Sequence, residues 1–274
     1  MPASPVPVRQ AATLMLVRDG PAGSGPLEVL MVRRSLRAAF VGGAFVFPGG
    51  AVDPADGGAE AEACCTGRTD AEASAVLEVD AGGLAYWVGV LRECFEEAGV
   101  LLAYGPDGRP LSFSDPSLDR RFAEHRRRIN AGDERFLDVC RREGLALAVD
   151  QVHYFAHWIT PRGANRRFDT RFFVAAAPPD QTPAHDDGEL IEDLWITPAE
   201  ALERRRAGQI ELILPTERNL GAIGRFSTTG ELLGAAAASA RVPLVEPRLM
   251  ADANGWRILL PGDDGYDEVA PPPS

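Results

Sequence analysis

Three glutamates within five residues form the part of this sequence best suited to chemistry. Glu93, Glu96 and Glu97 have the spacing i, i+3, i+4, which places three carboxylates on one face of a helix. Like charges so close repel one another, which destabilises a helix and raises carboxyl pKa values. A hard divalent cation removes this repulsion, and carboxylate oxygens are the ligands that Mg²⁺ and Mn²⁺ prefer. The spacing therefore predicts a Mg²⁺ or Mn²⁺ site, with a solvated acidic helix face as the alternative.

A double-glycine turn stands upstream of these glutamates. Phe47 and Pro48 end a short apolar run and lead into Gly49 and Gly50, a pattern typical of a tight turn after a strand. Glycine lets the backbone come close to a ligand, because no side chain obstructs the approach. Together, the turn and the acidic stretch resemble the signature of the Nudix hydrolase family, G-x5-E-x7-R-E-U-x-E-E-x-G-U, in which U is an aliphatic residue.

The sequence departs from that signature at three places. Asp56 stands where the family has a glutamate, so the carboxylate is carried on a side chain with a shorter reach. Between Asp56 and Arg92 lie 35 residues where the signature has seven, an insertion of 28 residues. Cys94 takes an aliphatic position, which a small buried thiol can fill. We therefore expect the insertion to change the loop and to leave the metal-binding helix intact.

The resemblance implies a hydrolase that cleaves nucleoside diphosphates linked to another moiety. It assigns the cation, Mg²⁺ or Mn²⁺, to four ligands: Glu93, Glu96, Glu97 and the backbone carbonyl of Gly50. Arg92 would pair with Glu96 at i+4 and orient it. The general base that activates water is expected to be Glu97 or Glu93, with Glu189, from a later acidic loop, as the alternative.

Four arginines are candidates for binding substrate phosphates, because a guanidinium can bind two phosphate oxygens at once: Arg33, Arg162, Arg167 and Arg171. The last three fall within ten residues of an expected strand-loop-strand. Surface solvation is the alternative for each of them.

Two further patterns narrow the resemblance to one branch of the family. The segment 29–35, taken with 45–50, looks like the region before the signature in coenzyme A diphosphatases. The long insertion, followed by Trp158 to Pro161 and by Arg167 to Phe173, resembles the peroxisomal acyl-coenzyme A diphosphatase branch. The leading hypothesis is therefore cleavage of coenzyme A or acyl-coenzyme A. Cleavage of NADH, ADP-ribose or another nucleotide conjugate is the second, and a nucleotide sensor without activity is the third.

Composition excludes several other classes of protein. The net charge of −12 argues against a nucleic-acid-binding surface. All 28 basic residues are arginine, which excludes Schiff-base chemistry and a P-loop lysine. No apolar run approaches the length of a membrane span, and the C-terminal residues match no known address signal. We expect a cytoplasmic enzyme with free thiols, and a homodimer by analogy with many relatives.

The pattern of apolar residues predicts an α/β fold, an α/β/α sandwich around a mixed sheet with helical insertions. One domain is expected over 8–240, with insertions at 51–83 and 115–143, followed by a partly irregular extension over 241–274. Strands are expected at 11–18, 27–34, 44–47, 100–103, 152–159, 168–177, 190–196 and 256–260. Helices are expected near 70–79, at 84–98, twice within 115–143, from 198 to Gly208, and once or twice within 215–240. The insertion at 51–83 is expected to be a surface excursion.

Overall fold

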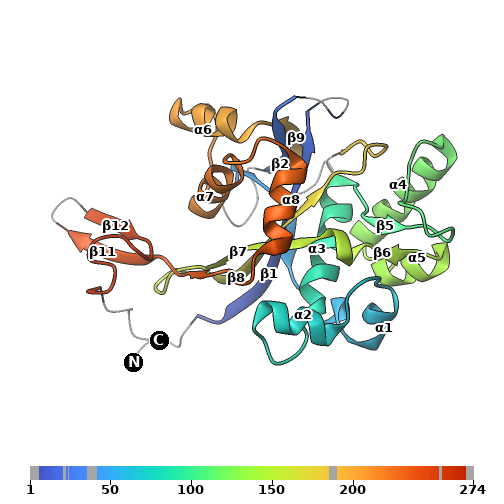
Figure 1. Ribbon diagram of the computed structural model, residues 1–274, viewed down its shortest axis with the longest axis horizontal. Coiled ribbons are helices and arrows are strands. Elements are labelled where there is room, and N and C mark those ends of the chain that lie inside the picture. Colours follow the sequence, from blue (N-terminus) through green and yellow to red (C-terminus); the bar gives the residue numbers. More distant parts are fainter. Residues whose placement is uncertain are drawn as a thin grey trace.

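A mixed eight-stranded sheet forms the middle layer of the molecule (Figure 1). The computed structural model describes residues 6–20, 23, 25–35, 42–184, 190–252 and 255–269. The strand order is β10-β7-β8-β1-β2-β3, with β4 also paired to β1 and β9 to β2. The strands of this sheet are β1 (Val8–Asp19), β2 (Leu27–Arg34), β3 (Phe45–Val46), β4 (Gly49–Ala51), β7 (His153–Ile159), β8 (Arg167–Ala176), β9 (Leu190–Ile196) and β10 (Leu244–Val245).

Strand β1 lies at the centre and is covered on both faces. It runs parallel to β8 and antiparallel to β2 and β4. Leu14 and Leu16 belong to one apolar core, and Met15 and Val17 belong to the other. Successive side chains of a strand point to opposite faces, so an unbroken apolar run is what a strand buried on both faces requires.

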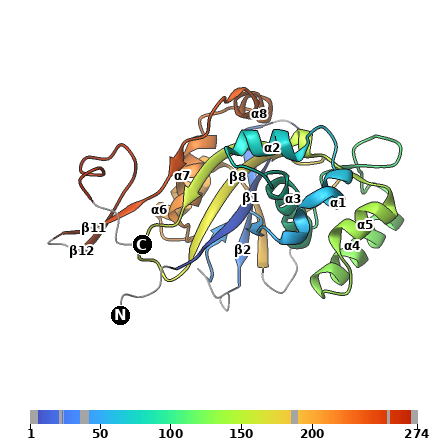
Figure 2. The same ribbon diagram turned by 90° about the horizontal axis from the view of Figure 1, so that it is seen from below.

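Helices cover each face of the sheet, and the two layers are seen from the side in Figure 2. On one face lie α1 (Gly58–Ala63), α2 (Asp70–Leu77), α3 (Leu84–Ala98), α4 (Pro116–Asn130) and α5 (Phe136–Glu143). On the other lie α6 (Pro198–Arg206), α7 (Leu214–Ile223) and α8 (Thr229–Ala238). The predicted α/β/α sandwich around a mixed sheet is confirmed, and so is the predicted range of the acidic helix, α3.

The insertion at 51–83 packs into the core, so the expected surface excursion is wrong. It contains a short 3₁₀ helix (Pro54–Asp56) and then α1 and α2. Ala61, Ala73 and Leu77 are buried in the same apolar core as α3. The composition of the insertion did not predict its burial, because small alanines fit against a neighbouring helix without forming a pronounced apolar stripe.

The second insertion, 115–143, forms two helices, α4 and α5, as predicted. They end and begin around the turn at 131–135. The predicted strand at 100–103 is shifted, because β5 (Ala103–Tyr104) starts only at its last residue and pairs with β6 (Ala146–Leu147) in a separate ladder.

The C-terminal extension has more regular structure than expected. Strand β10 joins the edge of the main sheet, parallel to β7. Strands β11 (Arg248–Asp252) and β12 (Gly255–Leu259) form an antiparallel hairpin, which projects from the body of the molecule in Figure 1.

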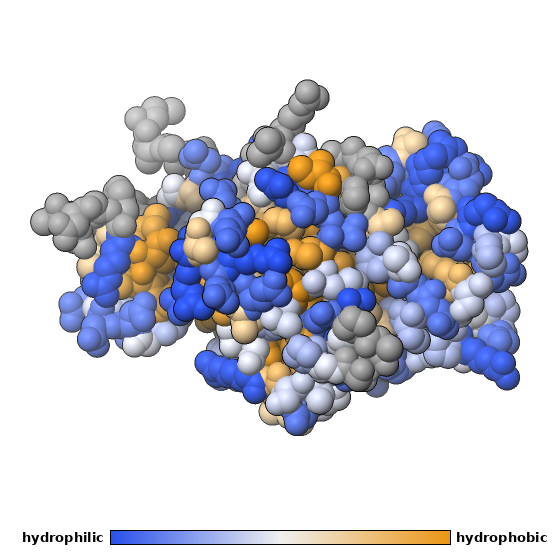
Figure 3. All heavy atoms as spheres, turned by 90° about the horizontal axis from the view of Figure 1, so that it is seen from above, coloured by the Kyte–Doolittle hydropathy of each residue, from blue (hydrophilic) through white to orange (hydrophobic). Residues whose placement is uncertain are grey.

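Hydrophilic residues cover most of the face shown in Figure 3, with apolar residues in separate groups. The large apolar side chains that the described residues expose come from five different strands and helices: Val8, Val76, Ile191, Leu244 and Ile258. Exposed apolar residues scattered singly are normal on protein surfaces, so they do not mark one interface. No helix in the described ranges is long and apolar enough to cross a bilayer.

Candidate active site

Helix α3 carries the three glutamates on the side that faces Gly49 and Gly50. Its N-terminal half is buried from Leu84 to Leu91, which anchors the helix against the sheet. It ends at Gly99, whose φ of 72° lies in the left-handed region and whose N–H donates to the carbonyl of Phe95 at 2.9 Å. Only glycine adopts this conformation without cost. The glutamates therefore occupy the last turn and a half of a rigidly held helix.

The predicted tight turn at Gly49 and Gly50 is wrong, because both glycines belong to strand β4 and pair with β1. This glycine pair contacts two of the glutamates directly. The N–H of Gly49 donates to Glu97 Oε2 at 2.7 Å. A Cβ atom on Gly50 would lie 2.5 Å from Glu93 Oε1, so only glycine fits against this carboxylate. The position of Gly50 beside Glu93 is fixed because Gly50 pairs with Ala12 of the central strand β1. The tertiary structure thus brings together the two parts of the signature.

Arg92 links the carboxylates to one another. Its Nη1 donates to Glu93 Oε1 at 3.0 Å and to Glu96 Oε2 at 2.9 Å, which includes the predicted i+4 pair. On its other edge, Nε and Nη2 donate to the two oxygens of Asp56 at 2.8 and 3.0 Å. A guanidinium clamped by three carboxylates keeps a fixed orientation.

Asp56 thereby takes the structural place of the signature glutamate in spite of the insertion. It is 2% exposed and also accepts a hydrogen bond from the N–H of Asp53 at 2.8 Å, as part of a capping box. A Cβ on Gly89 would lie 2.9 Å from Asp56 Oδ2, so α3 has no room for a side chain at this position. The shorter side chain reaches Arg92 because the 3₁₀ helix lies against α3.

We expect Asp56→Asn to lower the free energy of unfolding by about 3 kcal/mol, because a buried ion pair loses one partner while the other stays charged. Urea denaturation measures this loss. Asp107→Asn is the matched control, since Asp107 pairs at 3.9 Å with Arg109, whose side chain is 85% exposed; its effect should stay within about 0.5 kcal/mol. Equal stability of the two variants would contradict the structural role of Asp56.

Burial and mutual repulsion make the glutamate face an unfavourable place for unpaired negative charge. Burial raises the pKa of Glu93 to about 7; Arg92 opposes that rise, and the charges of Glu96 and Asp56 add to it. Burial also raises the pKa of Glu96 against the opposing effect of Arg92. A bound cation would offset this cost.

The donor types fit a hard divalent cation, since carboxylates and a backbone carbonyl beside a bare glycine are oxygen ligands. In the described part of the chain, however, no three acidic, histidine or cysteine side chains are placed so that they could hold a metal ion together. Arg92 and Gly49 hold the carboxylates instead.

Arg126 is a residue of this site that the sequence did not reveal. From α4, its Nε donates to the carbonyl of Glu96 at 2.9 Å and its Nη2 to that of Glu97 at 2.8 Å. Asn130 Nδ2 adds a bond to the Glu96 carbonyl at 3.1 Å. A cation at a helix C-terminus satisfies carbonyls that lack partners and interacts well with the helix dipole. The helical insertion thus fixes the end of the helix that carries the glutamates.

The four candidate arginines do not converge on this site. Arg33 pairs with Glu192 at 3.4 Å beside a hollow of about 440 Å³ at the β2–β3 edge. Arg167 pairs with Glu246 at 3.0 Å, and Arg162 lies 3.9 Å from the same carboxylate. These two hold the C-terminal segment against the β7–β8 loop.

Arg171 is the nearest of the four to Gly50 by strand register. Both Gly50 and Arg171 pair with Ala12 of β1, from opposite sides, so two strand spacings, about 10 Å, separate their backbones. Arg171 is buried and pairs with Asp169. Glu189, the alternative general base, lies outside the described residues.

Comparison with known proteins agrees with this geometry. The family model described as NUDT19 Nudix domain matches residues 68–221, more than half of the chain. The protein named Acyl-coenzyme A diphosphatase NUDT19 of Gallus gallus is 30% identical over 305 residues, which cover 95% of this chain and 80% of that protein. The protein of the same name from Homo sapiens is 29% identical over 276 residues, covering 88% and 72%.

A solved structure shares the fold. The Nudix hydrolase of Alicyclobacillus acidocaldarius superposes with a TM-score of 0.65 at 26% identity, covering 84% of this chain and 96% of that one. The resemblance drawn from the glycine turn and the acidic helix is therefore confirmed. This chain belongs to the Nudix hydrolase family, in the group of the NUDT19 Nudix domain, and is a pyrophosphohydrolase.

Proposed function

We propose that the enzyme is a Mg²⁺- or Mn²⁺-dependent diphosphatase that hydrolyses the pyrophosphate bond of coenzyme A or acyl-coenzyme A. The products would be adenosine 3′,5′-bisphosphate and phosphopantetheine or its acyl form. The observation that carries this proposal is the contact of Gly49 and Gly50 of β4 with the carboxylates of Glu93 and Glu97. The substrate class is supported by the relatives named acyl-coenzyme A diphosphatase.

The metal ligands in this proposal are Glu93, Glu96, Glu97 and the Gly50 carbonyl. Nudix hydrolases generally use divalent cations, and the oxygen donors gathered here suit one. When bound, such a cation supplies neutralising charge at the phosphate oxygens and lowers the pKa of a bound water.

The protein's own residues supply orientation and proton transfer. Arg92 fixes Glu93 and Glu96, and the Gly49 N–H fixes one oxygen of Glu97. Glu97 or Glu93 would take a proton from the attacking water, with Glu189 as the alternative base. The water oxygen then bonds to one phosphorus while the bridging P–O bond breaks and the second phosphate leaves. Positioning of this kind is the main protein contribution to phosphoryl transfer.

A hydrolysis panel tests this proposal. Purified enzyme is incubated with coenzyme A, an acyl-coenzyme A, NADH, ADP-ribose and a diadenosine polyphosphate, with Mg²⁺, with Mn²⁺ and with a chelator. We expect adenosine 3′,5′-bisphosphate from the first two substrates, and loss of all turnover in the chelator. Release of AMP from NADH with coenzyme A left intact would reject the substrate assignment, and full turnover in the chelator would reject the metal.

A further inference from the structure

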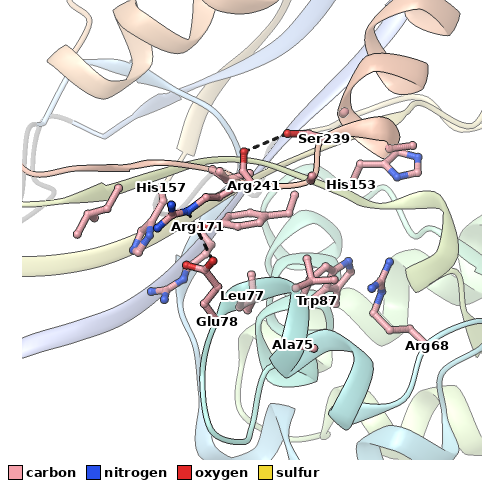
Figure 4. A pocket seen from close by; sticks show the side chains of 17 residues that line it. Arg68, Ala75, Leu77, Glu78, Trp87, His153, His157, Arg171, Ser239 and Arg241 are labelled. Atoms are coloured by element: carbon pink, nitrogen blue, oxygen red, sulfur yellow. Dashed lines mark hydrogen bonds and ion pairs between the residues drawn. The ribbon is translucent and has the colours of Figure 1, made fainter. Parts of the chain in front are cut away.

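A second pocket lies on the same side of the sheet as α3, beyond Arg171 (Figure 4). Its volume is about 450 Å³, within the range of small-molecule sites. It is lined by α2, the N-terminal half of α3, β7, β8, the end of α8 and the segment that follows it. In Figure 4, Arg68, Trp87 and His153 lie at one end of the pocket, and Arg171, His157 and Arg241 lie at the other.

Arg171 lines this pocket with a buried guanidinium. The residue is only 5% exposed, and its Nη1 pairs with Asp169. His157 Nε2 bonds to the same Asp169 oxygen at 2.6 Å, which holds the carboxylate in place. The Nε atom of Arg171 is buried, with no hydrogen-bond partner among the described residues. A buried donor without an acceptor is costly, and such a group in a native structure points to a missing partner.

Arg68 lines the pocket at the other end. Its guanidinium stacks over the ring of Trp87, 4.8 Å from the ring centroid, which fixes its plane. Its Nε is also buried and without a hydrogen-bond partner in the described ranges. The stacking leaves the edge of the guanidinium as the part able to bind a ligand.

Positive charge prevails among the lining residues, although the chain as a whole carries −12. Arg68, Arg171 and Arg241 line the pocket with a single carboxylate, Glu78, which lies 3.6 Å from Arg241. Arg241 is 77% exposed and stands at the mouth. Burial lowers the pKa of His153, and the Arg68 charge lowers it further, so this side chain is neutral at neutral pH and the positive charge comes from the arginines.

We propose that this pocket binds the phosphomonoester group of a phosphorylated small molecule, with Arg171 and Arg68 as donors to its oxygens. Arginine edges match phosphate geometry and provide charge-assisted hydrogen bonds. The volume exceeds that of a phosphate alone, so the ligand is of nucleotide size.

Two sources of this phosphate share the same chemistry. One is the 3′-phosphate of coenzyme A bound at the glutamate site beside Gly50, about 10 Å away by the strand spacing between Gly50 and Arg171; this source rests on the proposed function. The other is a separate nucleotide that binds independently of the substrate.

Calorimetric titration with adenosine 3′,5′-bisphosphate, in chelator to silence metal binding, tests the site itself. We expect Arg68→Gln and Arg171→Gln each to weaken binding by about tenfold or more, because each loses a charge-assisted hydrogen bond. Arg109→Gln removes the same charge from a side chain that is 85% exposed and outside the pocket, and it should bind as the wild type does.

Arg171 also neutralises Asp169, so the Arg171→Gln variant will lose stability. The decisive variant is therefore Arg68→Gln. Wild-type affinity in a folded Arg68→Gln variant, or no binding by the wild type, would overturn the proposal. Inorganic phosphate as competitor should displace the bisphosphate from the wild type.

Steady-state kinetics then separates the two sources. If the phosphate belongs to the substrate, Arg68→Gln raises KM for coenzyme A about tenfold and leaves KM for 3′-dephospho-coenzyme A unchanged. If a separate nucleotide binds, both KM values stay the same while titration still shows the loss. Absence of any coenzyme A hydrolysis would reject the proposed function, and the titration would still decide on the pocket.

Discussion

Replacing Glu96 with glutamine is expected to lower kcat for pyrophosphate hydrolysis by about 10³-fold while the protein stays folded. Glutamine keeps an oxygen for the 2.9 Å bond from Arg92 Nη1 but loses the negative charge. Charge stabilisation by a metal site contributes several kcal/mol to the transition state, and about 4 kcal/mol corresponds to 10³-fold in rate. Steady-state kinetics on the substrate that the panel identifies measures the loss.

The thermal stability of the Glu96→Gln variant should not fall together with its activity. Burial raises the pKa of Glu96, so its ionised form is unfavourable, and a neutral side chain should leave the Tm unchanged or raise it. Glu124→Gln is the matched control, because Glu124 is an exposed helical glutamate paired with Arg127 at i+3. It should keep the wild-type rate. Unaltered turnover in Glu96→Gln would refute the assignment of this glutamate to the catalytic centre.

Adding one methyl group at Gly50 is expected to lower kcat by about 10²-fold with little change in stability. The new Cβ would lie 2.5 Å from Glu93 Oε1, so the carboxylate must move. Displacing the end of a flexible side chain costs little folding free energy, but a shift of about 1 Å in a catalytic group can cost 10²-fold in rate. Kinetics and thermal denaturation of Gly50→Ala measure both effects.

Alanine variants at two other glycines distinguish displacement of the Glu93 carboxylate from a general loss of stability. At Gly49, φ is +154° and a Cβ would lie 2.4 Å from the backbone oxygen of Ala12, so Gly49→Ala should lose stability, because neither chain segment can move aside. Gly221 lies in α7 with no atom near the added Cβ, and its alanine variant should behave as the wild type. A Gly50→Ala enzyme with full activity would mean that Glu93 has no fixed position in catalysis.

The sequence by itself determined the acidic helix, its range and the glycine pair that faces it, although that pair lies in strand β4 and not in the predicted turn. These features depend on local spacing: three glutamates at i, i+3 and i+4, a glycine that ends the helix, and two glycines after a strand. The strands β1, β2, β8 and β9 were also predicted close to their observed bounds. For β1 and β2 the reason is that buried strands need continuous apolar runs.

The partners of the arginines were decided only by the tertiary structure. The crowding of Arg162, Arg167 and Arg171 suggested one phosphate-binding group, yet Glu246 binds the first two and Asp169 binds the third. Side chains that are neighbours in the sequence alternate between the two faces of a strand, and some of them pair with a distant segment. A single sequence therefore does not show which carboxylate lies opposite each guanidinium.

The contacts that the two insertions make with α3 were also decided only by the tertiary structure. Arg126 caps the acidic helix α3 from 30 residues away, and Asp56 reaches Arg92 across 36 residues. Local spacing fixes which side chains share a face, because helix and strand geometry repeats over a few residues. Contacts across a long insertion depend on how the whole chain packs its cores, and that is settled only when all the helices and strands are in place.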